Sequence, residues 1–305
     1  YTIGSSSTFA DVSGSPKAKF LAVIRDFVVT AHNNTSSTNN PFRVQWSQIN
    51  DADTWTVGSN QADFQDIPDA GNITGLVGGD FGVVLLERGI ARMQYVGSPL
   101  IFTFDMVETG HGCDIPNSIS ALAPTQIFYL ASDGFFMFNG ERSIPIGAEK
   151  VDSFFFDDSS PHHLDRLSCS IDPINQVVAW SYVSNESVAG TPDKIIMYNY
   201  AVGRWSLAEL DHEFIGTIIS PSFTLEALAT ISSSLDALGT SLDSRFFRGG
   251  QSAFAASSSS KIASFTGDAL AATLETAEFE PAKLKKSLVK SVTPYVTSKD
   301  VAPTL

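Results

Sequence analysis

The sequence has few charged residues and few cysteines. Asp, Glu, Lys and Arg make up 17% of the 305 residues, against about 25% in an average soluble protein. The two cysteines, Cys113 and Cys169, are too few for the multi-disulfide framework of small secreted domains, so we expect two buried thiols. Apolar runs such as Gly82–Leu86 are far shorter than the roughly 20 residues of a membrane helix, so we expect no membrane partner.

Cations are also scarce. The chain has 19 Lys and Arg against 33 Asp and Glu, which gives a net charge of −14. Proteins that clamp nucleic-acid phosphates need a basic face, so the balance argues against that class. The acidic net charge does not exclude a protein that lets nucleic acid slide past without holding it. The 43% of apolar residues and the 22 phenylalanines exclude whole-chain disorder and favour β-structure.

One pattern recurs along the chain: a short apolar strand, a tight turn and a second apolar strand. The turns centre near Asp26, Asp80, Gln126 and Asn175. Their spacing of about 50 residues is the period of a four-stranded propeller blade with its loops. Candidates for the third and fourth strands of the four repeats lie at 42–46 and 55–57, 90–96 and 101–107, 135–138 and 143–146, and 194–200 and 205–207. The sequence therefore predicts an all-β fold, a β-propeller-like array of antiparallel four-stranded blades.

The pattern is interrupted after residue 213. A fifth unit spans roughly 213–280, with a hairpin predicted from strands at 252–256 and 261–265 and alternating strand patterns at 273–279 and 287–296. Leucines and isoleucines at helical spacing predict one short helix at 224–238, with Thr224 as N-cap and Gly239 at its end. We expect an N-terminal extension or interface arm at 1–19, the propeller-like domain at 20–282 and a C-terminal strand or extension at 283–305, in a chain that is part of a longer protein.

Two groups of side chains suggest metal binding. The denser one has His162 and His163 beside three carboxylates, Asp157, Asp158 and Asp165. Neighbouring histidines on a strand point to opposite sides, so we interpret this segment as a solvated acidic loop. The other group, His111, Cys113 and Asp114, lacks a second Cys or His pair at metal-ligand spacing. No metal ligand is assigned.

Enzymatic motifs are missing as well. No Gly-x-Ser-x-Gly or Walker motif occurs. A propeller-fold glycosidase would need paired carboxylates, for which Asp80, Asp105, Asp133 and Asp172 are candidates, although Asp is common in tight turns. We therefore expect no enzyme, no catalytic residue and no cofactor. The tryptophans near the strand ends are interpreted as blade-packing anchors, with sugar-stacking platforms as the alternative: Trp46, Trp55, Trp180 and Trp205.

Five ordered segments carry a family resemblance over roughly 20–295. They are Trp-Ser with Asp and Trp at 44–55; Cys-Asp-Ile-Pro-Asn-Ser-Ile at 113–119 with 127–134, 138–140 and 146–152; Ser-Leu-Asp-Ser at 241–244; Arg-Gly-Gly at 248–250; and Phe-Thr-Gly at 265–267 with 272–276. This set resembles the tail nozzle or hub proteins of short-tailed bacteriophages, also described as DNA-stabilisation or head-closure proteins.

The resemblance implies a structural protein of the virion tail. Its subunits would form a homo-oligomeric ring, a hexamer, that contacts a portal-adaptor ring and other tail proteins while DNA passes through the lumen without sequence-specific binding. We expect carboxylates to line or flank this lumen and repel phosphates, and the segments 1–19 and 283–305 to form the lateral interfaces. The alternative function is a carbohydrate-binding propeller, either a receptor-binding tail component or a lectin. An extracellular glycosidase is a third hypothesis.

Overall fold

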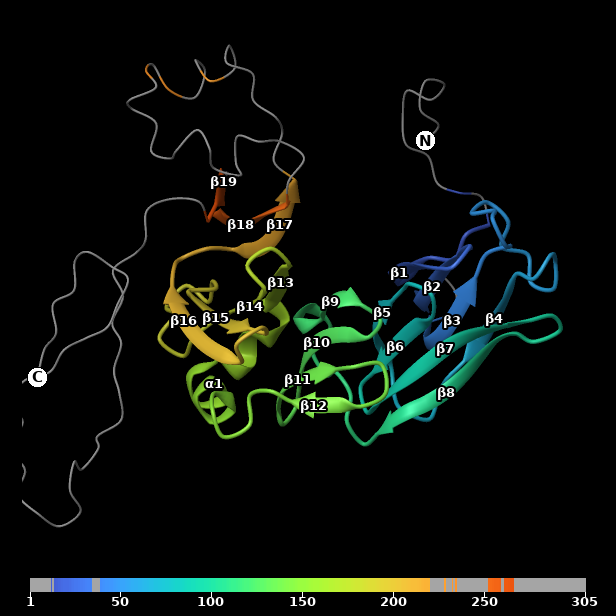
Figure 1. Ribbon diagram of the computed structural model, residues 1–305, viewed down its shortest axis with the longest axis horizontal. Helices are drawn as coiled ribbons and strands as arrows, with labels where there is room; N and C mark the ends of the chain where they lie inside the picture. The colour runs from blue at the N-terminus through green and yellow to red at the C-terminus, as the bar shows by residue number, and fades with distance from the viewer. Residues whose placement is uncertain are drawn as a thin grey trace, which may run out of the picture. The chain divides into compact units, whose positions relative to one another are not determined.

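The fold is almost entirely β-structure (Figure 1). The computed structural model describes residues 12, 14–34, 39–219, 228, 232, 234, 252–258 and 261–265, and all structural statements below concern these residues. The chain divides into two compact units, Tyr1–Gly267 and Asp268–Leu305. Every described residue belongs to the first unit.

Five antiparallel sheets follow one another along the chain, and we number them blades 1 to 5. In the four-stranded sheets each strand pairs with the next one in sequence. Blade 1 comprises β1 (Ala18–Ile24), β2 (Phe27–Asn34), β3 (Asn39–Trp46) and β4 (Asp63–Asp66), and blade 2 comprises β5 (Ile73–Val77), β6 (Gly82–Leu86), β7 (Gly89–Gly97) and β8 (Ile101–Thr109). Blade 3 comprises β9 (Ser120–Ala123), β10 (Gln126–Ala131), β11 (Gly134–Phe138) and β12 (Ser143–Pro145).

Blade 4 comprises β13 (Ser168–Asp172), β14 (Val177–Tyr182), β15 (Lys194–Asn199) and β16 (Arg204–Glu209), and the described part of blade 5 comprises β17 (Phe214–Ile219), β18 (Ser252–Ser258) and β19 (Lys261–Ser264). The all-β class and the array of antiparallel blades are thereby confirmed. All four repeat turns lie where the sequence predicts them, between the first and second strands of blades 1 to 4. The hairpin predicted near 252–265 is β18 and β19.

The blades share one orientation, which gives the array two different ends. In an up-and-down sheet the first and third turns lie at one end, and the second turn and the connection to the next blade lie at the other. The first turns of blades 1 and 2 meet where the Arg25 N–H donates to the Gly79 carbonyl over 2.9 Å. At the opposite end, the Asn117 side chain donates to the Asp165 carbonyl over 3.1 Å and joins two successive connections. We call these the first-turn end and the linker end.

Apolar side chains on facing sheets hold neighbouring blades together. One buried cluster joins blades 1 and 2 and includes Phe27, Trp46 and Phe102, and a second joins blades 2 and 3. A third cluster joins blades 3 and 4 around Phe135 and Trp180. Because each inner blade packs on both faces, its central strands read as continuous apolar runs. For example, all five residues of β6 are buried.

The strand predicted at 55–57 is wrong. Residues 47–62 instead form a loop, and the fourth strand of blade 1 is β4 (Asp63–Asp66). The Asp51 carboxylate explains the difference, because it accepts the Asp53 N–H and the Thr54 hydroxyl, each over 2.8 Å. Such local bonds offer the backbone an alternative to sheet pairing.

The structure contains one short helix that the sequence pattern did not predict. Helix α1 (Asp152–Asp158) lies in the connection between blades 3 and 4 and buries only Phe155. With one buried side chain the segment has no amphipathic period, so tertiary packing decides its conformation. The helix predicted at 224–238 and the strands predicted at 273–279 and 287–296 lie outside the described residues, apart from isolated positions. None of the described helices is long and apolar enough to cross a membrane.

Blades 1 and 2 approach each other closely at Gly78. A Cβ atom there would lie 2.2 Å from the Val23 carbonyl oxygen, which is backbone and cannot swing away. We expect Gly78→Ala to lower the free energy of unfolding by about 2 kcal/mol in urea titrations, as overpacking does. Gly97→Ala is the control. A Cβ atom at Gly97 would have no other atom within 4 Å, so with its φ of +81° this variant measures backbone strain without overpacking. A Gly78→Ala variant as stable as the wild type would contradict this close approach.

Candidate functional site: the acidic linker end

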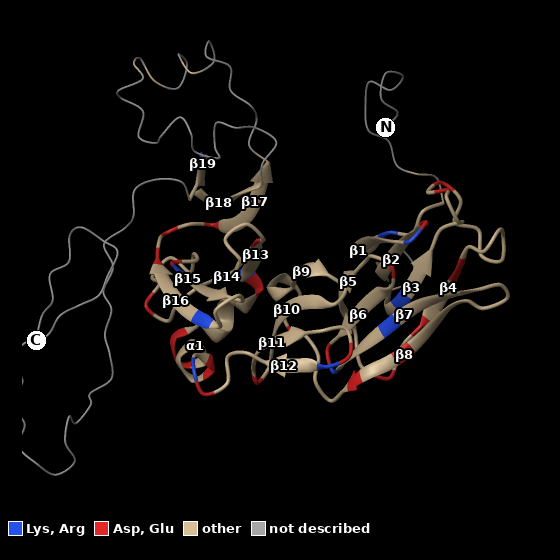
Figure 2. Cartoon of the chain, in the orientation of Figure 1, with Lys and Arg blue, Asp and Glu red and all other residues tan. Residues whose placement is uncertain are grey.

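Carboxylates are concentrated at the linker end. The described turns and connections there hold thirteen carboxylates against three cations, Arg88, Lys150 and Arg166; the carboxylates are Asp69, Glu87, Asp114, Asp133, Glu149, Asp152, Asp157, Asp158, Asp165, Glu186, Asp193, Asp211 and Glu213. The described turns of the first-turn end hold five carboxylates (Asp26, Asp51, Asp53, Asp80, Glu141) and two arginines. The excess of Asp and Glu over Lys and Arg is visible in Figure 2. The two ends therefore differ strongly in charge.

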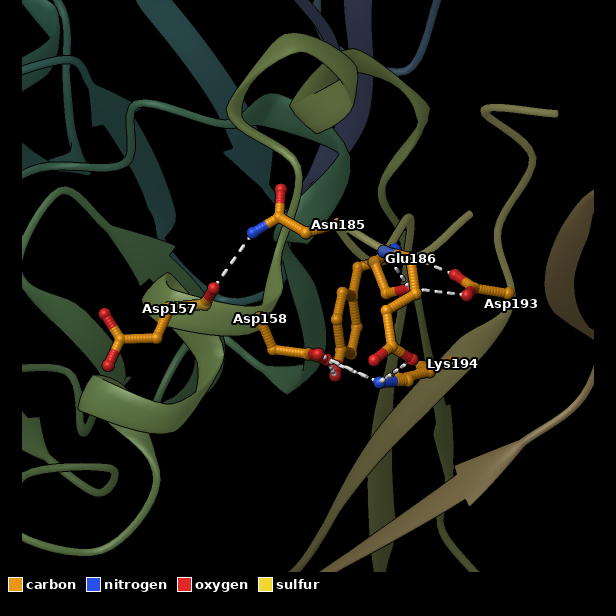
Figure 3. A network of polar contacts seen from close by, with 8 residues as sticks. Asp157, Asp158, Asn185, Glu186, Asp193 and Lys194 are labelled. Carbon is orange, nitrogen blue, oxygen red and sulfur yellow. Dashed lines mark hydrogen bonds and ion pairs between the residues drawn. The ribbon is translucent and has the colours of Figure 1, made fainter. Parts of the chain in front are cut away.

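A further cation, at a strand end beside these turns, is buried among the carboxylates (Figure 3). Lys194, at the start of β15, donates to both oxygens of Asp158 over 2.9 and 3.2 Å. The Tyr182 hydroxyl donates to the same carboxylate over 2.7 Å. The side chains of Lys194 and Asp158 are only 10% and 16% exposed, and the bond to Asp158 raises the pKa of Lys194. This pair ties α1 to blade 4.

A second bonded carboxylate lies beside this pair. Asp193 accepts the backbone N–H of Ser184 over 2.7 Å and its hydroxyl over 2.6 Å, which fixes the turn between β14 and β15. Glu186 in that turn is 83% exposed, and its carboxylate lies 3.8 Å from the Lys194 ammonium. A cavity of about 290 Å³ opens here, lined by Glu186, Asp193, Lys194, Glu209, Leu210 and Asp211. Four carboxylates line this cavity, and its one lysine is already paired with Asp158, so the cavity presents a negative surface to solvent.

Carboxylates between blades 2 and 3 repel one another. Partial burial is the main cause that raises the pKa of Asp114, and the charges of Glu87 and Asp133 raise it further. Burial also raises the pKa of Asp152, against a hydrogen bond from the Phe135 N–H, and Asp133 adds to the rise. Like charges held together in this way resist ionisation. Burial, with a smaller contribution from neighbouring carboxylates, therefore disfavours the charged forms of Asp114 and Asp152.

The structure separates the two suggested metal-binding groups. Asp158 is occupied by Lys194, while His162, His163 and Asp165 lie in the 3₁₀ segment η2 (Pro161–Arg166) rather than in an irregular loop. His111 lies 3.4 Å from Asp133. Burial raises the pKa of the Cys113 thiol to about 11, so it stays protonated and is a poor metal ligand. Among the described residues, no three His, Cys, Asp or Glu side chains are placed to share a metal ion.

The candidate aromatic and carboxylate sites are also separated. Trp46, Trp55 and Trp180 are buried, and the indole N–H of each donates to a backbone carbonyl over 2.8 Å. Trp205 is half-buried and stacks on Trp180 with ring centroids 5.8 Å apart. These rings act as packing anchors and leave no paired face for a sugar. Among the four candidate carboxylates, Asp80 and Asp172 lie at the first-turn end, Asp133 at the linker end and Asp105 within β8.

Sequence reasoning missed a buried Ser–His pair at the linker end. His212 Nε2 lies 2.5 Å from the Ser181 hydroxyl, and His212 Nδ1 lies 2.5 Å from the Leu210 carbonyl. Since a carbonyl only accepts, Nδ1 carries the proton and Nε2 accepts from Ser181. Ser181 is fully buried and His212 is 3% exposed. No motif flags the pair, because the two residues are 31 positions apart on different elements.

The buried His212 should make stability depend on pH. Burial is the main cause that lowers its pKa below the ordinary 6.5, although the Leu210 carbonyl, Asp193 and Asp211 oppose the shift. The unfolded chain takes up this proton before the folded chain does, so stability is full above about pH 6.5 and falls as the pH drops below it. We expect the Tm to decline between pH 7 and 5, and His212→Gln to remove part of that decline. His111→Gln, which removes an exposed histidine, is the control for the loss of a histidine side chain.

These features define the chain as an all-β array of propeller-like blades whose linker end is strongly acidic. Comparison with known proteins adds no closer assignment. No protein-family model matches the sequence, and no curated protein matches it.

Proposed function

We propose that this chain is a structural subunit of the tail nozzle or hub ring of a short-tailed bacteriophage. In this proposal it forms a homo-oligomeric ring, the linker end borders the passage of the DNA, and the protein performs no chemical turnover. Two features support the proposal. The blades pack on both faces into a stiff wall, and the sequence resembles that family along nearly its whole length.

The observation that carries the proposal is the charge of the linker end, thirteen carboxylates against three cations in its described turns. A DNA conduit must not hold the duplex that it passes. Lys and Arg contacts release counterions and retain DNA, whereas carboxylates repel its phosphates. An acidic face suits such a passage better than a site that captures a ligand.

The test compares charge removal at the two ends. We expect the wild-type chain to bind duplex DNA only weakly at about 50 mM salt, because its acidic face repels phosphates. The variant Glu149→Gln/Asp157→Asn/Glu213→Gln neutralises three exposed carboxylates of the linker end, and we expect it to bind DNA roughly tenfold more tightly than the wild type in fluorescence anisotropy.

The matched control is Asp26→Asn/Asp53→Asn/Glu141→Gln, which removes three exposed charges from the first-turn end. It should change DNA binding by no more than about twofold, since these turns lie far from the acidic face. Equal effects of the two variants, or tight DNA binding by the wild type, would contradict the proposal. The mass and symmetry of the purified particle test the ring itself, and a strict monomer at all concentrations would contradict that part.

A further inference from the structure

Two arginines converge in a cavity at the first-turn end, the opposite end from the acidic face. The cavity has a volume of about 200 Å³ and lies where blades 1 and 2 meet. Its lining is polar and comes from the first turns of both blades and from β7: Arg25, Asp80, Phe81, Arg92, Gln94 and Tyr95. In a chain with so few cations, two guanidinium groups around one cavity stand out from the rest of the surface.

Neither arginine is neutralised by a carboxylate. Among the described residues, Arg92 forms no ion pair although Asp105 faces it across the β7–β8 register. Its Nε atom is buried and has no hydrogen-bond partner. Arg25 donates from Nε to the Asp80 backbone carbonyl over 3.2 Å, and its guanidinium lies 5.4 Å from the centre of the Tyr95 ring. The remaining guanidinium N–H groups of Arg25 are left for another acceptor.

Arg43 in β3 of blade 1 is an example of an arginine whose guanidinium is paired with a carboxylate. It forms two bonds to the Asp66 carboxylate, over 2.7 and 2.9 Å, and lies 3.8 Å from the Phe64 ring centre. A buried guanidinium N–H without an acceptor is unfavourable. Arg92 has no such carboxylate partner among the described residues, so the terminal N–H groups of its guanidinium are available to an acceptor in the cavity.

The backbone at Arg25 is a second, independent observation. Arg25 has a φ of +52° in the tight turn between β1 and β2, a conformation that favours Gly, Asn or Asp. Its backbone N–H is fixed by the Gly79 carbonyl over 2.9 Å. The turn and this bond fix the backbone from which the Arg25 side chain reaches the cavity.

We propose that Arg25 and Arg92 bind a phosphate group in this cavity, with the Gln94 amide as a further donor. Two guanidiniums and an amide offer more donors than the two oxygens of one carboxylate accept, whereas the oxygens of a phosphate accept from all of them. Asp80 at the rim limits the net charge of the cavity to +1. The acidic linker end lies at the opposite end of the blades, so its charge is screened from this cavity. The site is independent of the proposed conduit function.

The test measures binding of inorganic phosphate by NMR titration of the full chain. We expect saturable binding to the wild type, with chemical-shift changes at Arg25, Arg92 and Tyr95. Arg92→Gln and Arg25→Gly should each weaken it at least tenfold. Arg25→Gly also relieves the turn strain, so its Tm should equal or exceed that of the wild type, which separates lost binding from lost folding. Arg204→Gln removes an exposed positive charge elsewhere and should bind as the wild type does.

A second arm identifies the source of the phosphate, with a short DNA duplex as the probe. Duplex binding that Arg92→Gln abolishes and inorganic phosphate competes for would assign the site to a nucleic-acid backbone, and tight binding of this kind would at the same time contradict the conduit proposal. Phosphate binding without duplex binding would assign it to a free phosphate or a phosphorylated small molecule. Absence of phosphate binding at tens of millimolar, or equal binding by wild type and both cavity variants, would overturn the proposal.

Discussion

We expect Trp180→Ala to destabilise the protein by about 4 kcal/mol, the largest effect of any single substitution considered for this chain. Trp180 is fully buried in β14, and its ring centre lies 4.7 Å from that of Phe135 in blade 3. Its indole N–H donates to the Ser118 carbonyl over 2.8 Å, across a sequence separation of 62 residues. Truncation would leave a cavity and an unpaired carbonyl between two blades, and both are costly.

Urea unfolding followed by circular dichroism measures this loss without depending on tryptophan fluorescence. Trp180→Phe is the matched control, because it keeps most of the ring contacts and loses the hydrogen bond to Ser118. It should cost about 1–2 kcal/mol. If the free energy of unfolding of Trp180→Ala lies within about 1 kcal/mol of the wild-type value, this side chain does not hold blades 3 and 4 together.

We expect Lys194→Met to cost about 3 kcal/mol at neutral pH. The substitution leaves the Asp158 carboxylate, 16% exposed, with the Tyr182 hydroxyl as its remaining side-chain donor. Removing one partner of a largely buried ion pair leaves an uncompensated charge, which costs more than the pair contributes.

The double variant Asp158→Leu/Lys194→Met separates pairing from packing. Since replacing a whole buried pair by apolar side chains is often nearly neutral, it should regain most of the stability lost in Lys194→Met. Urea titrations of the wild type and both variants at pH 7 complete the comparison. If the double variant is as unstable as Lys194→Met, the loss comes from the missing attraction between Lys194 and Asp158. It then does not come from an unpaired buried carboxylate.

The repeat could be predicted from the sequence because it is local. Each blade needs an apolar strand, a turn of two to five residues and another apolar strand, and this pattern is complete within about 50 residues. The turn residues at Asp26, Asp80 and Asn175 carry the conformational preferences that place the turns. The strand predicted at 55–57 is wrong because the Asp51 carboxylate accepts hydrogen bonds from Asp53 and Thr54 that favour a loop, and no hydrophobic pattern records them.

The candidate sites could not be predicted in the same way. Asp158 and Lys194 are 36 residues apart and Ser181 and His212 are 31 apart, so only the fold brings each pair together. The charge of the linker end has the same origin. The sequence contains the acidic residues, but the up-and-down course of each blade sorts the turns into two ends.

The amino-acid sequence by itself determined the all-β class, the blade period, the places of the repeat turns and the acidic net charge, because strand and turn preferences and charge act over a few residues. Only the tertiary structure decided where that charge gathers, which carboxylates are neutralised, and that Arg25 and Arg92 meet at one cavity between blades 1 and 2. Those outcomes depend on the packing of one sheet against the next. Side-chain contacts of that kind join residues tens of positions apart and leave no periodic trace in the chain.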